Sequence, residues 1–200
     1  MRPVTVLFMG SQGAGKGTQA RLLIEYLEKN DPDHKVLFHN AGSRFREFVE
    51  GDSFTQKIVR ASLERGELQP VFFSVLLWTQ SFIDKVTSND IHFVIDGSPR
   101  SLLEAEVLED ALEFYKHENS VVLYINIDAE IAVERLVKRG RSDDTEEGIR
   151  ERHKWHEEQT LPIVEYYRKR PYCAVIEIDG NGTVEEVHKD IVEKLEQHFS

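Results

Sequence analysis

Short apolar segments rich in β-branched residues recur along the chain, at residues 4–9, 36–38, 93–95, 121–127 and 174–178. Segments of this length and composition are typical of buried strands. The longer segments between them carry apolar residues at helical spacing, as at Leu23 and Leu27. This alternation predicts an α/β fold with a parallel sheet, because parallel strands need crossovers that pack helices onto both faces. Ligands of such a sheet bind at the carboxyl ends of its strands.

The last predicted helix has its own start signal. Residues 179–182 form an Asp-Gly-Asn-Gly turn, Thr183 can cap the helix that follows, and Glu186 completes a capping box. The segment beyond is amphipathic as far as Phe199. We therefore expect the chain to close with a helix packed on the sheet.

The composition favours a single domain. With 200 residues, 40% of them hydrophobic, the chain can bury one sizeable core but not comfortably two. Its 36 acidic and 25 basic residues give a formal charge of −11, which disfavours binding to nucleic acid or to a membrane surface. No stretch reaches the roughly 18 consecutive apolar residues of a membrane-spanning helix. A phosphate site must therefore be a local basic pocket.

Cysteine and histidine residues offer little chemistry of their own. Cys173 is single, which excludes an intrachain disulfide, and residues 1–9 lack the pattern of a secretory signal, so we expect a cytoplasmic protein with a buried thiol. His153 and His156 are expected to be exposed, because zinc normally needs three or four protein ligands. Packing in the core or in a subdomain accounts for the aromatic residues Trp78, Trp155, Phe72 and Phe73.

A glycine-rich loop follows the first predicted strand and precedes a helical pattern: Gly10-Ser11-Gln12-Gly13-Ala14-Gly15-Lys16-Gly17-Thr18-Gln19. Glycines let backbone N–H groups curl around phosphate oxygens, and the helix N-terminus adds its positive dipole end. Lys16 can then reach the β and γ phosphates. Gly17 stands where the general pattern has Ser or Thr, with the hydroxyl following at Thr18, so the link to Mg²⁺ is less direct. Phosphate binding is favoured over an ordinary glycine-rich turn.

Two further groups of charged residues fit phosphate chemistry. Asp96 and Arg100 end the third predicted strand, where a carboxylate can hold Mg²⁺ through water and a guanidinium can grip a phosphate. The same Asp-Gly-x-Pro sequence is equally a good turn. Four arginines follow further on, and a solvated charged helix would explain them alone: Arg135, Arg139, Arg141 and Arg152. The combination favours phosphoryl transfer, which depends on several cations around the migrating group.

Four motifs together resemble the adenylate kinase and uridylate-cytidylate kinase family over nearly the whole chain. The loop 10–19 matches except for Gln12, where proline is usual, and residues 96–100 match except for Ser98, where Phe is usual. The segment 141–144 and the helix after it, with Arg152, Thr160-Leu161-Pro162 and Tyr166-Tyr167, form the third motif. The fourth comprises residues 41–46 and 66–70, which resemble the acceptor-nucleotide subdomain.

The resemblance implies a three-layer, P-loop nucleoside triphosphate hydrolase-like sandwich with a five-stranded parallel sheet. It implies one kinase domain over residues 1–200, with a small helical acceptor-binding insertion at 41–70. The implied reaction transfers the γ-phosphoryl of Mg²⁺-bound ATP to a nucleoside monophosphate, with AMP as the expected acceptor and a monomeric protein by analogy.

The resemblance also assigns residue roles. ATP would be bound by Gly13, Ala14, Gly15, Lys16, Gly17, Thr18 and, against the base, Arg135. Mg²⁺ would be held by Thr18 and, through water, by Asp96. The acceptor would contact Ala41, Gly42, Arg46, Leu68, Arg100 and Glu104. Catalysis would rest on Lys16, Arg100, Arg139, Arg141 and Arg152.

The chain departs from the family at the lid. Family members carry a lid of about ten to some tens of residues between the arginines that are here Arg139 and Arg141, whereas this chain has only Gly140. Residues 139–143 are thus a vestigial lid. Since a lid excludes water, we expect a more open donor site, with weaker ATP binding or some ATP hydrolysis.

The acceptor base site departs as well. Adenylate kinases usually have a Gln where this chain has Glu104 and a Thr where it has Ala41, which is what the uridylate-cytidylate branch carries. An ionised Glu only accepts hydrogen bonds, which suits guanine or cytosine better than adenine. CMP, UMP or GMP is therefore an alternative acceptor. In a second interpretation, Glu104 is a surface residue and backbone groups near Leu68 and Gln69 hold the base.

Two other functions remain open. One is a nucleotide-binding regulator with little transfer activity, although a pure binder has no need of the arginines. The other is a P-loop kinase with a non-nucleotide acceptor, against which the acceptor-like segments argue.

Overall fold

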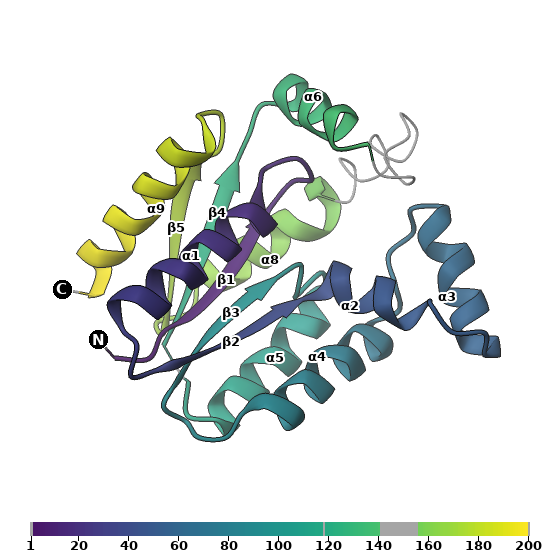
Figure 1. Ribbon diagram of the computed structural model, residues 1–200, viewed down its shortest axis with the longest axis horizontal. Helices are drawn as coiled ribbons and strands as arrows, with labels where there is room; N and C mark the ends of the chain where they lie inside the picture. Colours follow the sequence, from purple (N-terminus) through teal and green to yellow (C-terminus); the bar gives the residue numbers. More distant parts are fainter. Residues whose placement is uncertain (1, 118, 141–155, 200) are drawn as a thin grey trace.

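The computed structural model describes residues 2–117, 119–140 and 156–199. One five-stranded, fully parallel sheet with the order β2-β3-β1-β4-β5 forms its centre (Figure 1). The strands are β1 (Thr5–Gly10), β2 (Lys35–Asn40), β3 (Ile91–Asp96), β4 (Ser120–Asn126) and β5 (Cys173–Asp179). The five predicted apolar segments are therefore confirmed as the strands of the sheet.

Helices cover both faces of the sheet, as predicted. One face is covered by α1 (Lys16–Asn30) and α9 (Val184–Phe199), which contact each other. The other face is covered by α4 (Val71–Lys85), α5 (Leu102–Phe114) and α8 (Leu161–Arg168). At the end of the sheet where the strands finish lie α2 (Ala41–Phe48), α3 (Phe54–Glu64), α6 (Ala129–Arg139) and a π-helical turn, η1 (His156–Thr160) (Figure 1).

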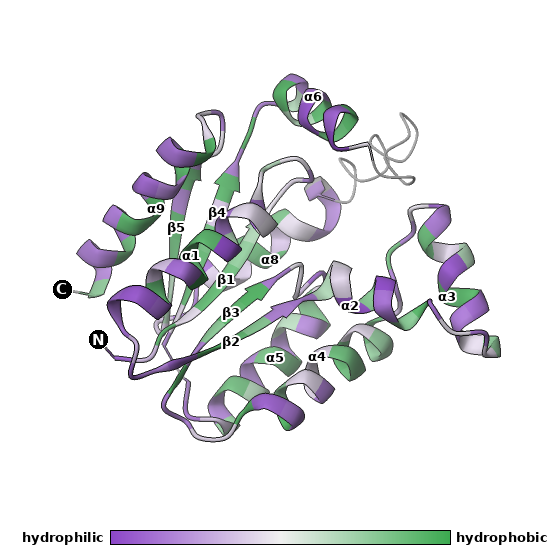
Figure 2. Ribbon diagram, in the orientation of Figure 1, coloured by the Kyte–Doolittle hydropathy of each residue, from purple (hydrophilic) through white to green (hydrophobic). Residues whose placement is uncertain are grey.

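The two faces of β1 show why its sequence is continuously apolar. Val6 and Phe8 are buried in one cluster with side chains of α1 and α9. Leu7 and Met9 are buried in the other cluster with side chains of α4, α5 and α8. Successive side chains of a strand point to opposite faces, so a strand covered on both sides needs apolar residues at every position. The strands accordingly form the hydrophobic centre in Figure 2.

A third, smaller cluster lies beneath α2 and α3. It contains Phe45 of α2, Val59 of α3, and Phe73 and Leu77 of α4. The packing role expected for Phe73 is confirmed, but the one expected for Phe72 is wrong, because its side chain is 71% exposed. Adjacent helical residues differ by about 100° in direction, so Phe73 turns inward and Phe72 outward.

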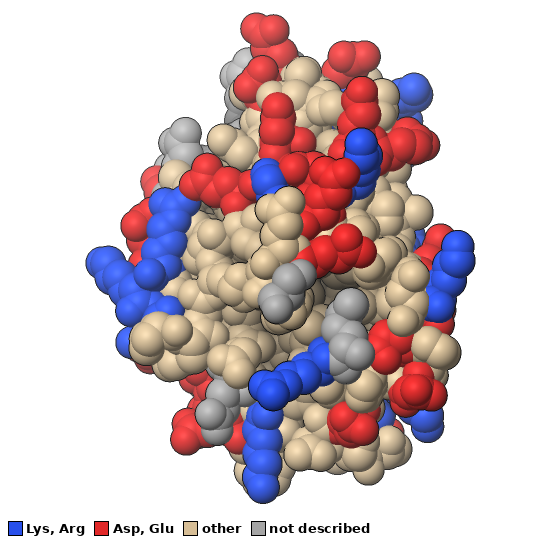
Figure 3. Space-filling model, turned by 90° about the vertical axis from the view of Figure 1, so that its left-hand side faces the viewer, with Lys and Arg blue, Asp and Glu red and all other residues tan. Residues whose placement is uncertain are grey.

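Other predictions about the core are confirmed. Trp78 and Cys173 are buried, whereas Trp155 lies outside the described residues. The capping box of α9 forms, with Thr183 N–H donating to Glu186 Oε2 at 2.8 Å and Glu186 N–H donating to Thr183 Oγ1 at 3.2 Å. Within the described residues, none of the helices is long and apolar enough to cross a membrane. On the face in Figure 3, acidic side chains gather over the upper part, while basic ones are scattered, with groups at the left, at the lower centre and at the right edge.

Candidate active site

The phosphate loop connects β1 to α1 in the predicted order. Gly10, Gly13 and Gly15 all have positive φ angles, of 136°, 87° and 86°. A Cβ at Gly10 would lie 2.2 Å from the carbonyl oxygen of Ile125 in β4, and one at Gly13 would lie 2.7 Å from that of Ala132 in α6. Glycine is therefore required at Gly10 and Gly13 for two reasons: the positive φ of the backbone and the close approach of β4 and α6.

Lys16 folds back over this loop. Its ammonium group donates hydrogen bonds to the carbonyl oxygens of Gly10 at 2.8 Å and Ser11 at 2.7 Å. The pKa of Lys16 is lowered to about 8, chiefly by burial; the charge of Asp96 opposes this decrease, and the charges of Arg100 and Arg139 contribute to it. Cations crowded in this way favour an anionic ligand, because bound phosphate would relieve their mutual repulsion.

Asp96 lies at the carboxyl end of β3, directly beside the start of α1. A Cβ added at Gly17 would be 3.1 Å from Asp96 Oδ2, so the buried carboxylate faces the first turn that also carries Thr18. Burial raises the pKa of Asp96, and the charges of Lys16 and Arg100 oppose this rise. Carboxylate and hydroxyl oxygens are ligands of the kind that Mg²⁺ prefers, so Thr18 and Asp96 fit the metal that the resemblance implies.

The next turn brings together residues predicted to bind the acceptor. Gly97 has a φ of 84°, and a Cβ there would lie 3.4 Å from both Ala41 Cβ and a guanidinium nitrogen of Arg100. A Cβ at Gly42 would lie 3.3 Å from a guanidinium nitrogen of Arg46. The glycines thus leave room for two arginines beside the carboxyl ends of β2 and β3.

Glu104 is not a surface residue, so that interpretation of the sequence is wrong. It is 2% exposed and both of its carboxylate oxygens are engaged. Oε1 accepts from the Ser74 hydroxyl at 2.6 Å, and Oε2 accepts from the Arg100 backbone N–H at 2.8 Å. The carboxylate therefore fixes the backbone of the arginine that was predicted to grip phosphate.

The phosphate loop and the turn after β3 line a pocket. Its lining includes Lys16, Leu68, Arg100, His156, Gln159 and Thr160. The expectation that His156 is exposed is wrong, since its side chain is half-buried, stacks on Tyr124 at a 5.9 Å ring separation and hydrogen-bonds the Tyr124 hydroxyl at 3.1 Å. The imidazole is therefore held by Tyr124 while it lines the pocket.

Two of the four later arginines, Arg135 and Arg139, lie within the described residues. Arg139 acts electrostatically on Lys16 from the end of α6, where Gly140 ends the helix with a φ of 63°. Arg135 donates 2.8 Å hydrogen bonds to the carbonyl oxygens of Gly180 and Gly182, which ties α6 to the turn before α9. Arg141, Arg152, His153 and residues 141–143 of the expected vestigial lid lie outside the described residues.

Three residues of this region were not predicted from the sequence. Asn40 donates to Asp96, Ser74 donates to Glu104, and Tyr124 supports His156. Asn40 carries a signal that could have been used, because it is a polar residue at the carboxyl end of a parallel strand, where ligands bind. Ser74 and Tyr124 carry no comparable signal, since one is a helical serine and the other lies within an apolar strand.

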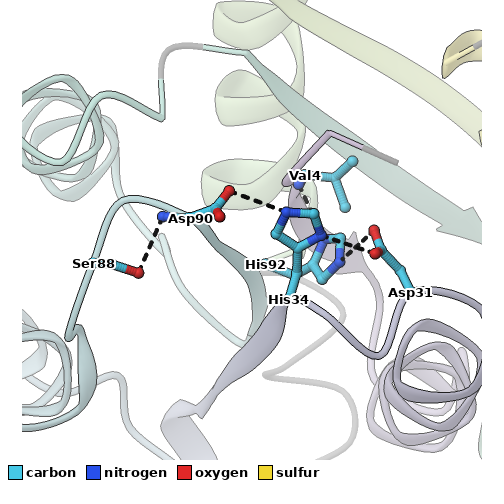
Figure 4. Close-up of polar contacts among 6 residues, drawn as sticks. All are labelled: Val4, Asp31, His34, Ser88, Asp90 and His92. Atoms are coloured by element: carbon cyan, nitrogen blue, oxygen red, sulfur yellow. Dashed lines mark hydrogen bonds and ion pairs between the residues drawn. The ribbon is translucent and has the colours of Figure 1, made fainter.

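A second cluster of metal-ligating residue types lies at the opposite edge of the sheet, where the strands begin (Figure 4). Asp31, His34 and His92 each place one ligand atom within 4.8 Å of the others. Nδ1 of the buried His92 accepts the Val4 N–H at 3.1 Å, so the ring proton sits on Nε2, 3.3 Å from Asp31 Oδ2. A metal ion on Nε2 would move this proton to Nδ1, against the Val4 N–H. His92 is therefore a poor metal ligand in this setting.

His34 occupies the centre of the same cluster. Its Nδ1 lies 2.8 Å from Asp31 Oδ1 and its Nε2 lies 3.0 Å from Asp90 Oδ1 (Figure 4). Both nitrogens face carboxylates and must donate, so the imidazole carries a positive charge. The hydrogen bond to Asp31 and the charges of Asp31 and Asp90 raise the pKa of His34 against the effect of burial. The cluster is thus a protonated His34 between two carboxylates rather than a metal site, and it joins the end of α1 to the start of β3.

Comparison with known proteins agrees with this geometry. The model of the family described as "Adenylate kinase" matches residues 8–172. Among similar proteins, the "Adenylate kinase" of Prochlorococcus marinus (strain MIT 9211) is 36% identical over 185 residues, which cover 91% of both chains. That of Synechococcus sp. (strain WH7803) is 35% identical over 91% of this chain and 93% of its own. That of Azobacteroides pseudotrichonymphae is 32% identical over 95% and 96%. The parallel sheet carries a phosphate loop with a carboxylate and arginines beside it, and the relatives match over nearly their full length. The chain therefore belongs to the adenylate kinase family of ATP-dependent nucleoside monophosphate phosphotransferases.

Proposed function

We propose that this enzyme catalyses the reversible transfer of the γ-phosphoryl group of Mg²⁺-bound ATP to AMP, giving two ADP. The observation that carries the proposal is the convergence of Lys16, Asp96 and Arg100 at one edge of the sheet, where their charges act on one another and where Lys16 and Arg100 line a pocket. Phosphoryl transfer needs little covalent chemistry from the protein and depends on positioning and on charge neutralisation. These three side chains supply both.

Each part of the site has a distinct task in this mechanism. The backbone N–H groups of residues 13–18 and the N-terminus of α1 bind the ATP phosphates, and Lys16 neutralises the migrating group. Thr18 and, through water, Asp96 would hold Mg²⁺, which would neutralise negative charge on the nucleotide phosphates. Arg139, Arg141 and Arg152 complete the cationic surround. Arg135 lies against the ATP base, in a position where its planar guanidinium can stack.

The acceptor site is proposed to comprise residues 41–70 and the turn after β3. Arg46 and Arg100 bind the acceptor phosphate, while Ala41, Gly42 and Leu68 border its nucleoside. AMP is favoured over CMP, UMP or GMP because both oxygens of Glu104 are already occupied by Ser74 and Arg100. Glu104 then acts by holding Arg100 rather than by reading the edge of the base. The net charge of −11 supports a small-molecule acceptor rather than nucleic acid.

The extent of the domain follows from the same proposal. Residues 1–200 form one kinase domain that acts as a monomer in the cytoplasm, and residues 139–143 replace the family's lid. The donor site is consequently more open to water than in lidded relatives. We expect measurable ATP hydrolysis without acceptor, or a raised KM for ATP. The lid hypothesis fails if hydrolysis without acceptor is negligible and the KM matches that of a lidded relative measured in parallel.

The direct test is a coupled assay of ADP formation from Mg²⁺-bound ATP. AMP, CMP, UMP and GMP are offered in turn, with a no-acceptor control and a Lys16→Ala variant. We expect AMP-dependent ADP formation that Lys16→Ala abolishes. Preference for another monophosphate would identify a different acceptor, and ATP binding without transfer to any of them would make the protein a nucleotide-binding regulator.

A second variant isolates the role of Glu104. If the carboxylate reads the base directly, Glu104→Gln should change which monophosphate is preferred. If it only holds Arg100, the order of preference should stay the same and the KM for each acceptor should change little, because a Gln oxygen can still accept from the Arg100 N–H. A switch in preference would refute the indirect role.

A further inference from the structure

One amide side chain links the two halves of this site. Asn40 is the last residue of β2, immediately before α2. Its Nδ2 donates to Asp96 Oδ2 at 2.5 Å. Its Oδ1 accepts from the backbone N–H of Ser43 at 2.7 Å and from the Ser43 hydroxyl at 2.8 Å. Both ends of the amide are therefore used, one on the carboxylate of β3 and the other on the first turn of α2.

The chemistry of the partners fixes the orientation of this amide. A carboxylate oxygen can only accept and a backbone N–H can only donate, so Nδ2 must face Asp96 and Oδ1 must face Ser43. The alternative flip would place Oδ1 against the carboxylate and Nδ2 against the N–H of Ser43. The Asn40 amide thus has one stable orientation, which fixes the position of Asp96 relative to the first turn of α2.

The contacts extend from Asn40 to both substrate sites. On one side, the Asp96 carboxylate faces the first turn of α1, where Gly17 leaves 3.1 Å between a hypothetical Cβ and Asp96 Oδ2. On the other side, a guanidinium nitrogen of Arg46 lies 3.4 Å from the Ser43 hydroxyl on the same helix that Asn40 caps. Asp96 serves the metal and Arg46 serves the acceptor phosphate in the proposed function.

We infer that Asn40 is a positioning residue that orients Asp96 towards the Mg²⁺ of the donor nucleotide and sets α2, with Arg46, in register with it. This inference rests on the proposed function and adds to it a residue outside the phosphate loop and the arginine set. A carboxylate that holds a metal through water depends on its own hydrogen-bond partner for direction, because the carboxylate rotates about its terminal bond. Asn40 supplies that partner from the neighbouring strand.

Two substitutions separate the two contacts of Asn40. Asn40→Ser keeps a good helix N-cap for Ser43 N–H but is too short to reach Asp96. Asn40→Ala removes both contacts. Asn30→Ala is a matched control, since Asn30 ends α1 and donates to the Tyr26 carbonyl at 2.8 Å, far from the pocket.

The first readout is binding, measured by the fluorescence of an ATP analogue titrated with MgCl₂ and compared with EDTA. We expect the half-saturating Mg²⁺ concentration to rise about tenfold in both Asn40→Ser and Asn40→Ala, and to stay unchanged in Asn30→Ala. The second readout is melting temperature without ligand, which should fall by about 2–4 °C in Asn40→Ala but much less in Asn40→Ser, because only alanine removes the cap. In the steady state, the KM for the acceptor should follow the cap and rise only in Asn40→Ala.

The outcomes distinguish this inference from the function on which it rests. Wild-type Mg²⁺ dependence in both Asn40 variants overturns the inference, whatever the melting temperatures show. A wild type that binds the analogue equally well in MgCl₂ and EDTA overturns both the metal site and the inference. Mg²⁺-dependent binding that weakens in both variants, without transfer to any monophosphate, supports the positioning role and overturns the kinase reaction instead.

Discussion

Replacement of Glu104 tests whether a buried carboxylate holds Arg100, the proposed phosphate-binding arginine, in place. Glu104→Ala removes two accepted hydrogen bonds, from Ser74 Oγ at 2.6 Å and from Arg100 N at 2.8 Å, in a position that is 2% exposed. Hydrogen bonds to a charged group contribute about 1.5–3 kcal/mol each, and water entering from the nearby pocket recovers part of that. We therefore expect a loss of about 3 kcal/mol in the free energy of unfolding. For a chain of this size the melting temperature would fall by about 6–12 °C.

Glu104→Gln should be milder for a specific reason. The Gln oxygen can still accept from Arg100 N, and the Ser74 hydroxyl can turn to accept from the Gln amide. Only the charge is lost, so we expect a loss of about 1 kcal/mol, or about 2–4 °C. Glu106→Ala, on the exposed face of the same helix, should stay within about 0.5 kcal/mol of the wild type. Differential scanning calorimetry gives all three values, and equal melting temperatures for Glu104→Ala and Glu106→Ala would refute the reasoning.

Two further predictions concern stability alone. Gly10→Ala should lower the melting temperature by about 6–12 °C or prevent folding, because its Cβ would lie 2.2 Å from the Ile125 carbonyl oxygen. In Gly15→Ala the new Cβ meets no atom within 4 Å, so the variant should be destabilised only by the positive φ, at a cost of about 1–3 kcal/mol. Equal losses of stability in a paired thermal melt would contradict this reasoning. His34 has a folded-state pKa raised above its unfolded value of about 6.5, so its stabilising effect is complete below that pH and is lost as the pH rises through the folded-state pKa. The melting-temperature difference between wild type and His34→Gln should accordingly shrink as the pH rises from about 6 to 9, while a constant difference, or a similar trend in the exposed control His198→Gln, would argue against a charged His34.

The sheet and the phosphate loop were predictable because their signals are local. The central strands β1, β3 and β4 are buried on both faces, so their sequences are mostly apolar, and a glycine-rich loop between a strand and a helix is contiguous in sequence. Gly10 and Gly13 could be identified as glycines that a turn requires. What they touch could not be identified, because Ile125 and Ala132 come from elements more than a hundred residues further along the chain.

The start of α5 shows where hydropathy misleads. Leu102 and Leu103 belong to the apolar pattern of this helix, yet they are 44% and 57% exposed, while Glu104 is 2% exposed. Hydrophobic periodicity would place the two leucines on the buried side of the helix and Glu104 on the exposed side. The inversion arises because Glu104 meets hydrogen-bond donors from α4 and from the turn after β3, and these partners are visible only when the elements are packed.

Two hydrogen bonds of the site, which the sequence did not predict, act in the same way. Asn40 fixes Asp96 across 56 residues of sequence, and Glu104 fixes the backbone of Arg100 from the helix that follows it. In a kinase with a mobile lid, closure can bring the last cations into place around the nucleotides. Under the proposal that this chain, with one residue between Arg139 and Arg141, has no lid, more of the alignment falls to groups already held at the edge of the sheet. Hydrogen bonds that restrict the carboxylate and the arginine before substrate binds reduce the ordering that transfer requires. Removal of either contact should therefore lower kcat in this enzyme, and restoring a longer lid should lessen that loss, because part of the alignment would then come from closure.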